Sequence, residues 1–123
     1  MKTKPLLTLE DAKRMAAAAE AEALGHQWNV VIAICDDGGH LMLLHRLDGV
    51  APISSTIAPA KARAAALGKR ETKLYEDMIN QGRTAFLSAP LDGMLEGGVP
   101  LLVDGYLAGP IGVSAVKSSE DAQ

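Results

Sequence analysis

Few side chains in this sequence are of a type and spacing that do chemistry in a recognised pattern. The three histidines, His26, His40 and His45, are too scattered to ligate a metal from one helix, and no HExxH pattern occurs. No serine lies in a GxSxG elbow, and neither GxGxxG nor GxxxxGK[ST] is present. The single cysteine, Cys35, lies in an apolar run, which favours a buried and inert thiol over a nucleophile.

Two cations in apolar surroundings are the remaining candidates. Arg46 ends a leucine-rich segment, and Lys61 lies within an alanine-rich one. A cation among small apolar residues either extends to water or meets an anion. The pair is therefore either solvated and salt-bridged, or it binds the carboxylate of a propionate or another small acid. The residues alone leave both interpretations open.

Composition limits the classes of function. The chain has 123 residues and a formal net charge of −3, which predicts one domain without the positive charge of a DNA or RNA binder. One Trp, two Tyr and one Phe are too few for a platform on which single-stranded nucleic acid stacks. Neither a signal-peptide-like segment at the N-terminus nor a run of transmembrane length occurs. We therefore expect a soluble cytoplasmic protein with no nucleic-acid or membrane partner.

The first half of the chain predicts a helix and a strand pair. Thr8 is a good N-cap for an alanine-rich helix over Leu9–Leu24. The β-branched run Trp28–Cys35 predicts a central strand that is covered on both faces. After an Asp36–Gly39 turn, His40–Arg46 predicts the return strand. Alternation then places one set of side chains on one face (Leu41, Leu43, His45) and another set on the other (Met42, Leu44, Arg46).

The second half predicts two helices followed by a hairpin. Ile53–Arg70 is helical in composition, and Pro59 within it predicts either a kink or a fresh start. A further helix is predicted over Thr72–Gln81. The segment Glu96–Ser114 predicts a hairpin that turns at Asp104-Gly105. Strands joined by hairpins, with helices inserted between them, predict an antiparallel α+β sheet.

Five segments of the sequence, in order, resemble the GlcG/HbpS family over roughly residues 8–121. They are Asp37-Gly38-Gly39-His40-Leu41, Arg46-Leu47-Asp48-Gly49, Ile57-Ala58 with Lys61-Ala62, Gly97-Gly98-Val99-Pro100-Leu101 with Asp104-Gly105, and Gly109 followed by Ile111-Gly112-Val113-Ser114. The resemblance implies a profilin-like α+β fold, in which helices pack on a five-stranded antiparallel sheet. It also implies one family domain over residues 1–123 and homo-oligomers that range from dimers to octamers.

The sequence departs from the family pattern in three places. Pro110 stands where the family has a small residue, and it removes one amide from its strand. Ala115-Val116-Lys117 replaces a Gly-Gly turn. The family's C-terminal helix, which usually continues beyond Glu120-Asp121, is expected to be missing or truncated.

The resemblance favours a binding protein for haem or a related tetrapyrrole, because some family members bind haem. In this interpretation Arg46 and Lys61 neutralise propionates, and a histidine ligates iron. His45 is the first choice for that ligand and His40 the second. The ligand-facing loop is made of Gly97, Gly98, Val99 and Pro100.

Two other interpretations compete with haem binding. The first is a cytoplasmic enzyme of a catabolic pathway, such as a tautomerase, hydrolase or decarboxylase, that acts on a small organic acid. Arg46 and Lys61 would hold the carboxylate of that acid, and Glu96 or Asp104 would be the general acid-base. The second is a scaffold subunit with no ligand, for which changes at Arg46 and Lys61 would alter no binding assay.

Overall fold

The described fold consists of two antiparallel strand pairs, a helix before the first pair, and the helices between the pairs. The computed structural model describes residues 1–89, 91–95, 97–103 and 106–114. The elements in chain order are α1 (Leu9–Gly25), β1 (Val31–Cys35), β2 (Leu41–Arg46), α2 (Ser54–Gly68), α3 (Lys73–Asn80), the 3-10 helix η1 (Thr84–Ser88), β3 (Gly98–Val103) and β4 (Tyr106–Ser114). No helix within those described ranges has the length and apolar character needed to cross a membrane.

The strands form one antiparallel sheet in the order β2-β1-β4-β3. The predicted α+β class and antiparallel sheet are confirmed, but the five-stranded sheet is wrong, because the described residues form four strands. The reason is that two hairpins supply all four strands. The chain between those hairpins forms helices instead, and leaves no described segment for a fifth strand. The predicted turn at Asp104-Gly105 lies outside the described residues.

Strand β1 lies between β2 and β4, and all five of its residues are buried. This confirms the prediction of a central strand covered on both faces. The alternation predicted for β2 is interrupted, because the register shifts between Ile34 and Cys35. Met42 consequently packs in the same cluster as Leu43, although strict alternation would separate them.

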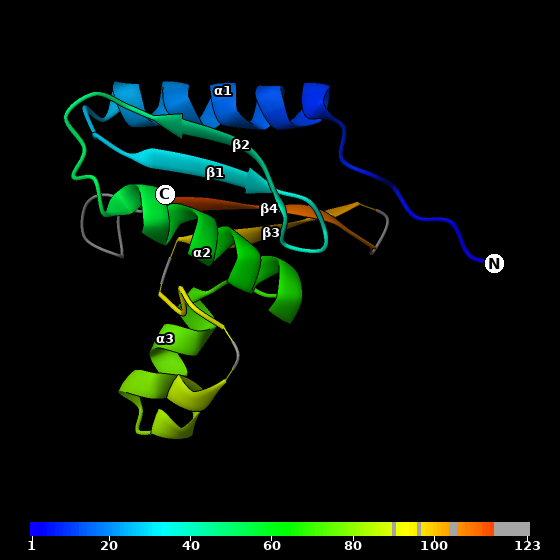
Figure 1. The fold of residues 1–123 in the computed structure, drawn as a ribbon, viewed down its shortest axis with the longest axis vertical. Helices are drawn as coiled ribbons and strands as arrows, with labels where there is room; N and C mark the ends of the chain where they lie inside the picture. Colours follow the sequence, from blue (N-terminus) through cyan, green and yellow to red (C-terminus); the bar gives the residue numbers. More distant parts are fainter. Residues whose placement is uncertain (90, 96, 104–105, 115–123) are drawn as a thin grey trace.

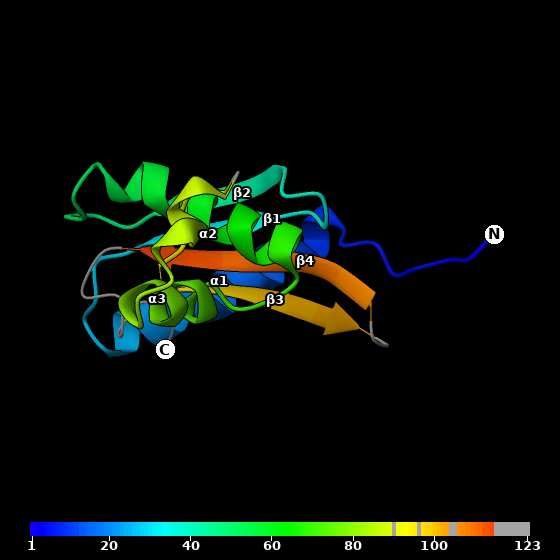
Figure 2. The same cartoon turned by 90° about the horizontal axis from the view of Figure 1, so that it is seen from below.

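Two helices cover opposite faces of the sheet (Figures 1 and 2). Helix α1 packs on β1 and β2 through small side chains such as Ala12 and Ala16, together with Ile32 and Ile34 of β1. On the other face α2 packs on β1, β3 and β4, and Ala58 and Ala62 are fully buried there. Helix α3 and η1 contact each other and lie away from the sheet, as Figure 1 shows.

The helix boundaries follow from caps that the sequence contains. Thr8 caps α1, and a reciprocal capping box joins it to Asp11, as predicted. Helix α2 runs continuously through Pro59, so the alternative in which a helix starts afresh at that proline is wrong. It ends at Gly68, and the following Lys69 adopts a left-handed conformation with φ of 54°.

Glycines allow α2 to lie unusually close to β3 and β4. A Cβ atom added at Gly112 would lie 2.1 Å from the Ala58 carbonyl oxygen and 2.7 Å from the Ala62 nitrogen. A Cβ at Gly98 would lie 2.4 Å from the Lys61 carbonyl oxygen. These atoms belong to the helix backbone, so any larger residue would push α2 off the sheet.

Candidate ligand-binding site

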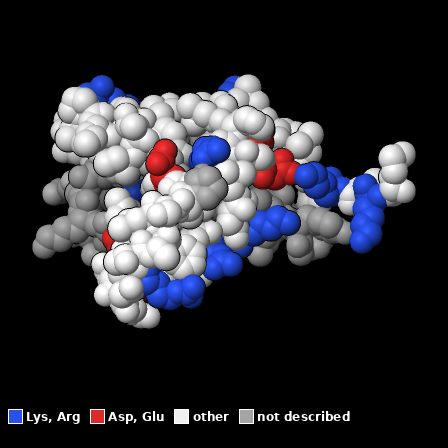
Figure 3. Space-filling model, turned by 60° about the horizontal axis from the view of Figure 1, so that its bottom comes forward, with Lys and Arg blue, Asp and Glu red and all other residues white. Residues whose placement is uncertain are grey.

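Lys61 is buried in the interface between α2 and the sheet. Its side chain is only 1% exposed, whereas other lysine and arginine side chains spread over the face shown in Figure 3. The Lys61 Nζ donates a hydrogen bond of 3.0 Å to the Val113 carbonyl oxygen. Lys61 therefore ties α2 to β4. The ligand contact predicted for it stays a prediction.

The segment predicted as a ligand-facing loop is a strand for most of its length, because Gly98, Val99 and Pro100 belong to β3, and its glycines pack against the protein itself. Gly97 and Gly98 are buried, and Gly98 exchanges two hydrogen bonds with Thr72. The Gly98 amide donates to Thr72 Oγ1 at 2.8 Å, and the Thr72 amide donates to the Gly98 carbonyl oxygen at 3.0 Å. Strand alternation puts Pro100 on the α2 face with Gly98, and Val99 on the opposite face beside its partner Ile111.

Arg46 lies at the far edge of the sheet from that loop. It ends β2, whereas Gly98 begins β3, and β1 and β4 lie between these strands. Arg46 is exposed and makes no hydrogen bond or ion pair with any residue that the structure describes. It lines a hollow of about 330 Å³ together with Glu20, Leu24 and Asn29. Arg46 and the Gly97–Pro100 segment therefore do not line one site.

The two candidate histidines are also apart. His45 is half-buried opposite Ile32, on the face that α1 covers, and its Nδ1 is buried with no hydrogen-bond partner among the described residues. The side chain of His40 is 81% exposed in the β1–β2 turn, where its Nδ1 lies 3.1 Å from the Asp36 carboxylate. Within the described part of the chain, no three His, Cys, Asp or Glu side chains are grouped to hold a metal ion. Glu96 and Asp104, the predicted acid-base residues, lie outside that part.

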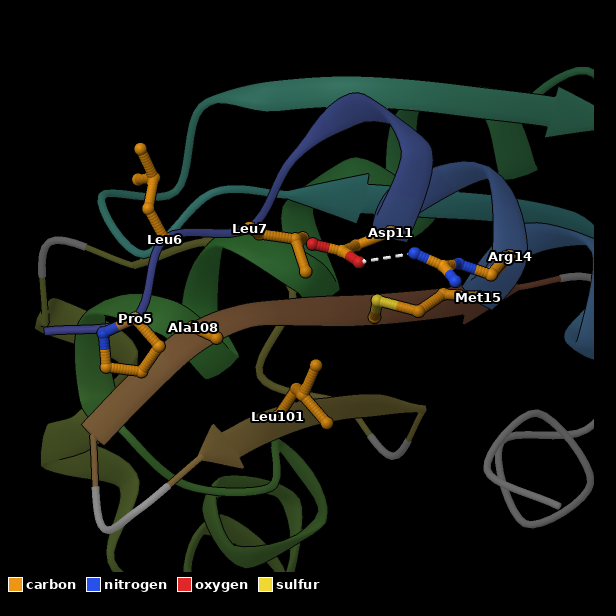
Figure 4. Close-up of a pocket in the computed structure, with 8 residues that line it drawn as sticks. All are labelled: Pro5, Leu6, Leu7, Asp11, Arg14, Met15, Leu101 and Ala108. Atoms are coloured by element: carbon orange, nitrogen blue, oxygen red, sulfur yellow. Dashed lines mark hydrogen bonds and ion pairs between the residues drawn. The ribbon is translucent and has the colours of Figure 1, made fainter.

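A different site lies on the sheet face that α1 leaves open. Because α1 packs on β1 and β2, the same face of β3 and β4 borders a hollow of about 370 Å³, which we call the α1-side hollow (Figure 4). Leu101 of β3 and Ala108 of β4 lie along one side of it, and Met15 of α1 points toward them. The other residues that line it are Pro5, Leu6, Leu7, Asp11 and Arg14.

The lining of the α1-side hollow is mostly apolar, with one ion pair at its rim. Arg14 Nη2 donates to Asp11 Oδ1 at 3.0 Å. The Thr8 amide and hydroxyl donate to Asp11 Oδ2, and these bonds lower the pKa of the Asp11 carboxyl below its usual value. Asp11 therefore stays ionised at neutral pH. The hollow can accept a flat apolar molecule and offers a guanidinium and a thioether beside it.

The sequence contained only a weak signal for this hollow. Met15 is a large side chain in a helix otherwise lined by alanines, three residues after the buried Ala12. Such a residue fills a core as readily as it lines a pocket. Its role became visible only once the strand order placed β3 and β4 beyond the edge of α1.

Cys35 is expected to be unreactive in the folded chain. It is 1% exposed, and burial raises the pKa of its thiol from 9.0 to about 11. A rise of about two pKa units leaves roughly 100-fold less thiolate at pH 8. A thiol reagent should therefore label the folded protein at least about 100-fold more slowly than the protein unfolded in denaturant. Labelling rates within a factor of ten of each other would contradict this.

Comparisons with known proteins agree with this architecture. A model of the family described as haem degrading protein HbpS-like matches residues 7–123. Protein GlcG of Escherichia coli is 55% identical over 114 residues, which cover 93% of this chain and 85% of GlcG. The crystal structure of HbpS has a TM-score of 0.88 at 29% identity, and covers 100% of this chain and 87% of HbpS. The crystal structure of a PduOC–haem complex has a TM-score of 0.83 at 28% identity, and covers 95% of this chain and 88% of that one.

Proposed function

Because this chain belongs to the family described as haem degrading protein HbpS-like, we propose that it binds haem or a related tetrapyrrole in the α1-side hollow. The observation that carries the proposal is the open apolar strip that Leu101, Ala108 and Met15 form between α1 and the β3–β4 hairpin. The PduOC–haem complex supports it, since that structure matches this fold closely.

The size and chemistry of the hollow suit such a ligand. Its volume of about 370 Å³ falls within the usual range of small-molecule sites. A tetrapyrrole has a flat apolar ring that would lie on Leu101 and Ala108, where it covers apolar surface from water. The hollow is open at one side, so part of the ring and its polar edge would remain in water.

Met15 is the residue of this hollow that we propose to face the iron. A methionine thioether is an established type of ligand to haem iron. When bound, haem would supply a redox-active iron, while the protein would supply the apolar surface and the sulfur ligand. His45 and His40 do not line the hollow, so the ligand role predicted for them is now the competing possibility.

A haem titration tests both the binding and the ligand. Adding haem to the purified protein should give a saturable Soret shift with one haem per chain. The variant Met15→Leu should still bind, because the side chain keeps its volume, but its Soret maximum should move. His45→Ala and His40→Ala should leave the spectrum unchanged.

Two results would overturn the proposal. No saturable shift with the unmodified protein would remove haem as the ligand. A spectrum that is unchanged in Met15→Leu but altered in His45→Ala would place the iron at strand β2 instead of the α1-side hollow.

A further inference from the structure

We infer that Arg14, oriented by Asp11, makes the α1-side hollow selective for ligands that carry a free carboxylate over the same ligands with that group esterified. The inference rests on the proposed function, and it concerns a different part of the ligand from the iron.

Both oxygens of the Asp11 carboxylate accept hydrogen bonds within the first turn of α1 and its cap. Its Oδ2 accepts hydrogen bonds from the Thr8 amide at 3.0 Å and from the Thr8 hydroxyl at 2.8 Å, and its own amide donates to that hydroxyl at 3.1 Å. This leaves Oδ1 to accept from Arg14 Nη2 at 3.0 Å. The cap that starts α1 therefore also fixes the carboxylate that holds the guanidinium, as Figure 4 shows for the pair.

Arg14 retains most of its hydrogen-bonding capacity in this position. Its side chain is 72% exposed, and Asp11 is its acceptor within the described part of the chain. A guanidinium has five N–H donors in a fixed plane, and a carboxylate accepts two of them side by side. The Asp11 carboxylate engages one edge of that plane, so another edge can meet a second carboxylate.

The neighbouring cations Lys4 and Lys13 do not line the hollow. Lys4 forms an ion pair with Asp37 in the turn after β1. Lys13 is exposed on α1 but does not line the hollow. Among the described lining residues, Arg14 is therefore the one basic group available to a carboxylate on a ligand whose ring lies against Leu101.

A comparison of protoporphyrin IX with its dimethyl ester separates the contribution of the carboxylates to binding from the contribution of the ring. Both lack iron, so Met15 does not contribute as a ligand, and both present the same apolar face. Titrations followed by porphyrin absorbance should show the free acid binding about tenfold more tightly than the ester. This factor corresponds to the low end of the binding free energy that a hydrogen bond between charged groups contributes.

Variants of α1 assign that preference to residues. Arg14→Gln should bring the ratio of the two affinities close to one, chiefly by weakening the binding of the free acid. The control Lys13→Gln removes the same charge at the adjacent residue and should leave the ratio unchanged. Asp11→Asn should lower the ratio only partly: the guanidinium loses its fixed position, which weakens binding of the free acid, but the variant also removes a negative charge that repels the ligand carboxylate, and this offsets part of the loss. A purely structural effect of Asp11→Asn on the cap would weaken acid and ester alike and leave the ratio unchanged.

The outcomes distinguish this inference from the proposed function. If both porphyrins bind equally to the unmodified protein, or if Arg14→Gln keeps the preference, the inference is overturned and tetrapyrrole binding stands. If neither porphyrin nor haem binds, both are overturned.

Discussion

Replacing Leu101 with glutamate should weaken haem binding by at least about tenfold, because a carboxylate would lose its water beneath an apolar ring. Leu101 is 36% exposed at the edge of the α1-side hollow, so the new side chain has room and the fold should tolerate it. The added negative charge would also repel a propionate held near Arg14. The measurement is the dissociation constant from a Soret titration.

Leu41→Glu is the matched control. Leu41 is also a strand leucine, is 53% exposed, and lies on β2 outside the lining of the hollow. This variant should bind haem as tightly as the unmodified protein. Equal losses in the two variants, or a loss only in Leu41→Glu, would contradict the position of the site.

Of the substitutions proposed here, Gly112→Ala should produce the largest loss of stability, about 3 kcal/mol or more in the free energy of unfolding. The added Cβ would lie 2.1 Å from the Ala58 carbonyl oxygen and 2.7 Å from the Ala62 nitrogen, and both atoms belong to the backbone of α2. Backbone atoms in a packed helix cannot move away as the end of a flexible side chain can. Denaturant unfolding followed by circular dichroism gives the value.

Gly25→Ala provides the control for the same chemical change. Gly25 is the last residue of α1, and nothing lies within 4 Å of a Cβ built there. This variant should be neutral or stabilise the protein by up to about 1 kcal/mol, since alanine is the better helix former. If Gly112→Ala costs no more than Gly25→Ala, the close packing of α2 on β4 is incorrect.

Much of the fold could be predicted from local patterns in the sequence. The capping box at Thr8, the β-branched run of β1 and the hairpin that contains β3 and β4 each depend on neighbouring residues, and each was predicted in place. The number of strands could not be predicted in this way. It depends on how many segments pair across the whole sheet, and the five strands came from the family resemblance alone.

The site was harder to predict, because the same residue types occur both where a protein contacts a ligand and where it packs against itself. A glycine pair before a strand permits the close approach of either a ligand or another backbone. At Gly98 the neighbour is the Lys61 carbonyl oxygen of α2. Likewise, a lysine in an alanine-rich helix can meet a ligand or a carbonyl, and Lys61 donates to Val113.

Arg14 and Met15 were missed for a geometric reason. On a helical wheel Met15 flanks the buried alanine stripe of α1, where a methionine is expected to fill the core, whereas Arg14 lies on the opposite side, where an arginine is expected to be solvated. Their proximity to Leu101 follows from α1 covering only one half of the sheet face. No pattern local to either segment contains that information.

The most direct test of tetrapyrrole binding in the α1-side hollow is a chemical-shift map of the protein with zinc protoporphyrin, a diamagnetic analogue of haem. We expect saturable shifts at the methyl groups of Met15, Leu101 and Ala108, which line the hollow. The methyl groups of Ala58 and Ala62, buried beneath α2 on the opposite face, should stay unchanged. Shifts confined to Ala58 and Ala62, or no saturable shifts at all, would contradict binding in this hollow.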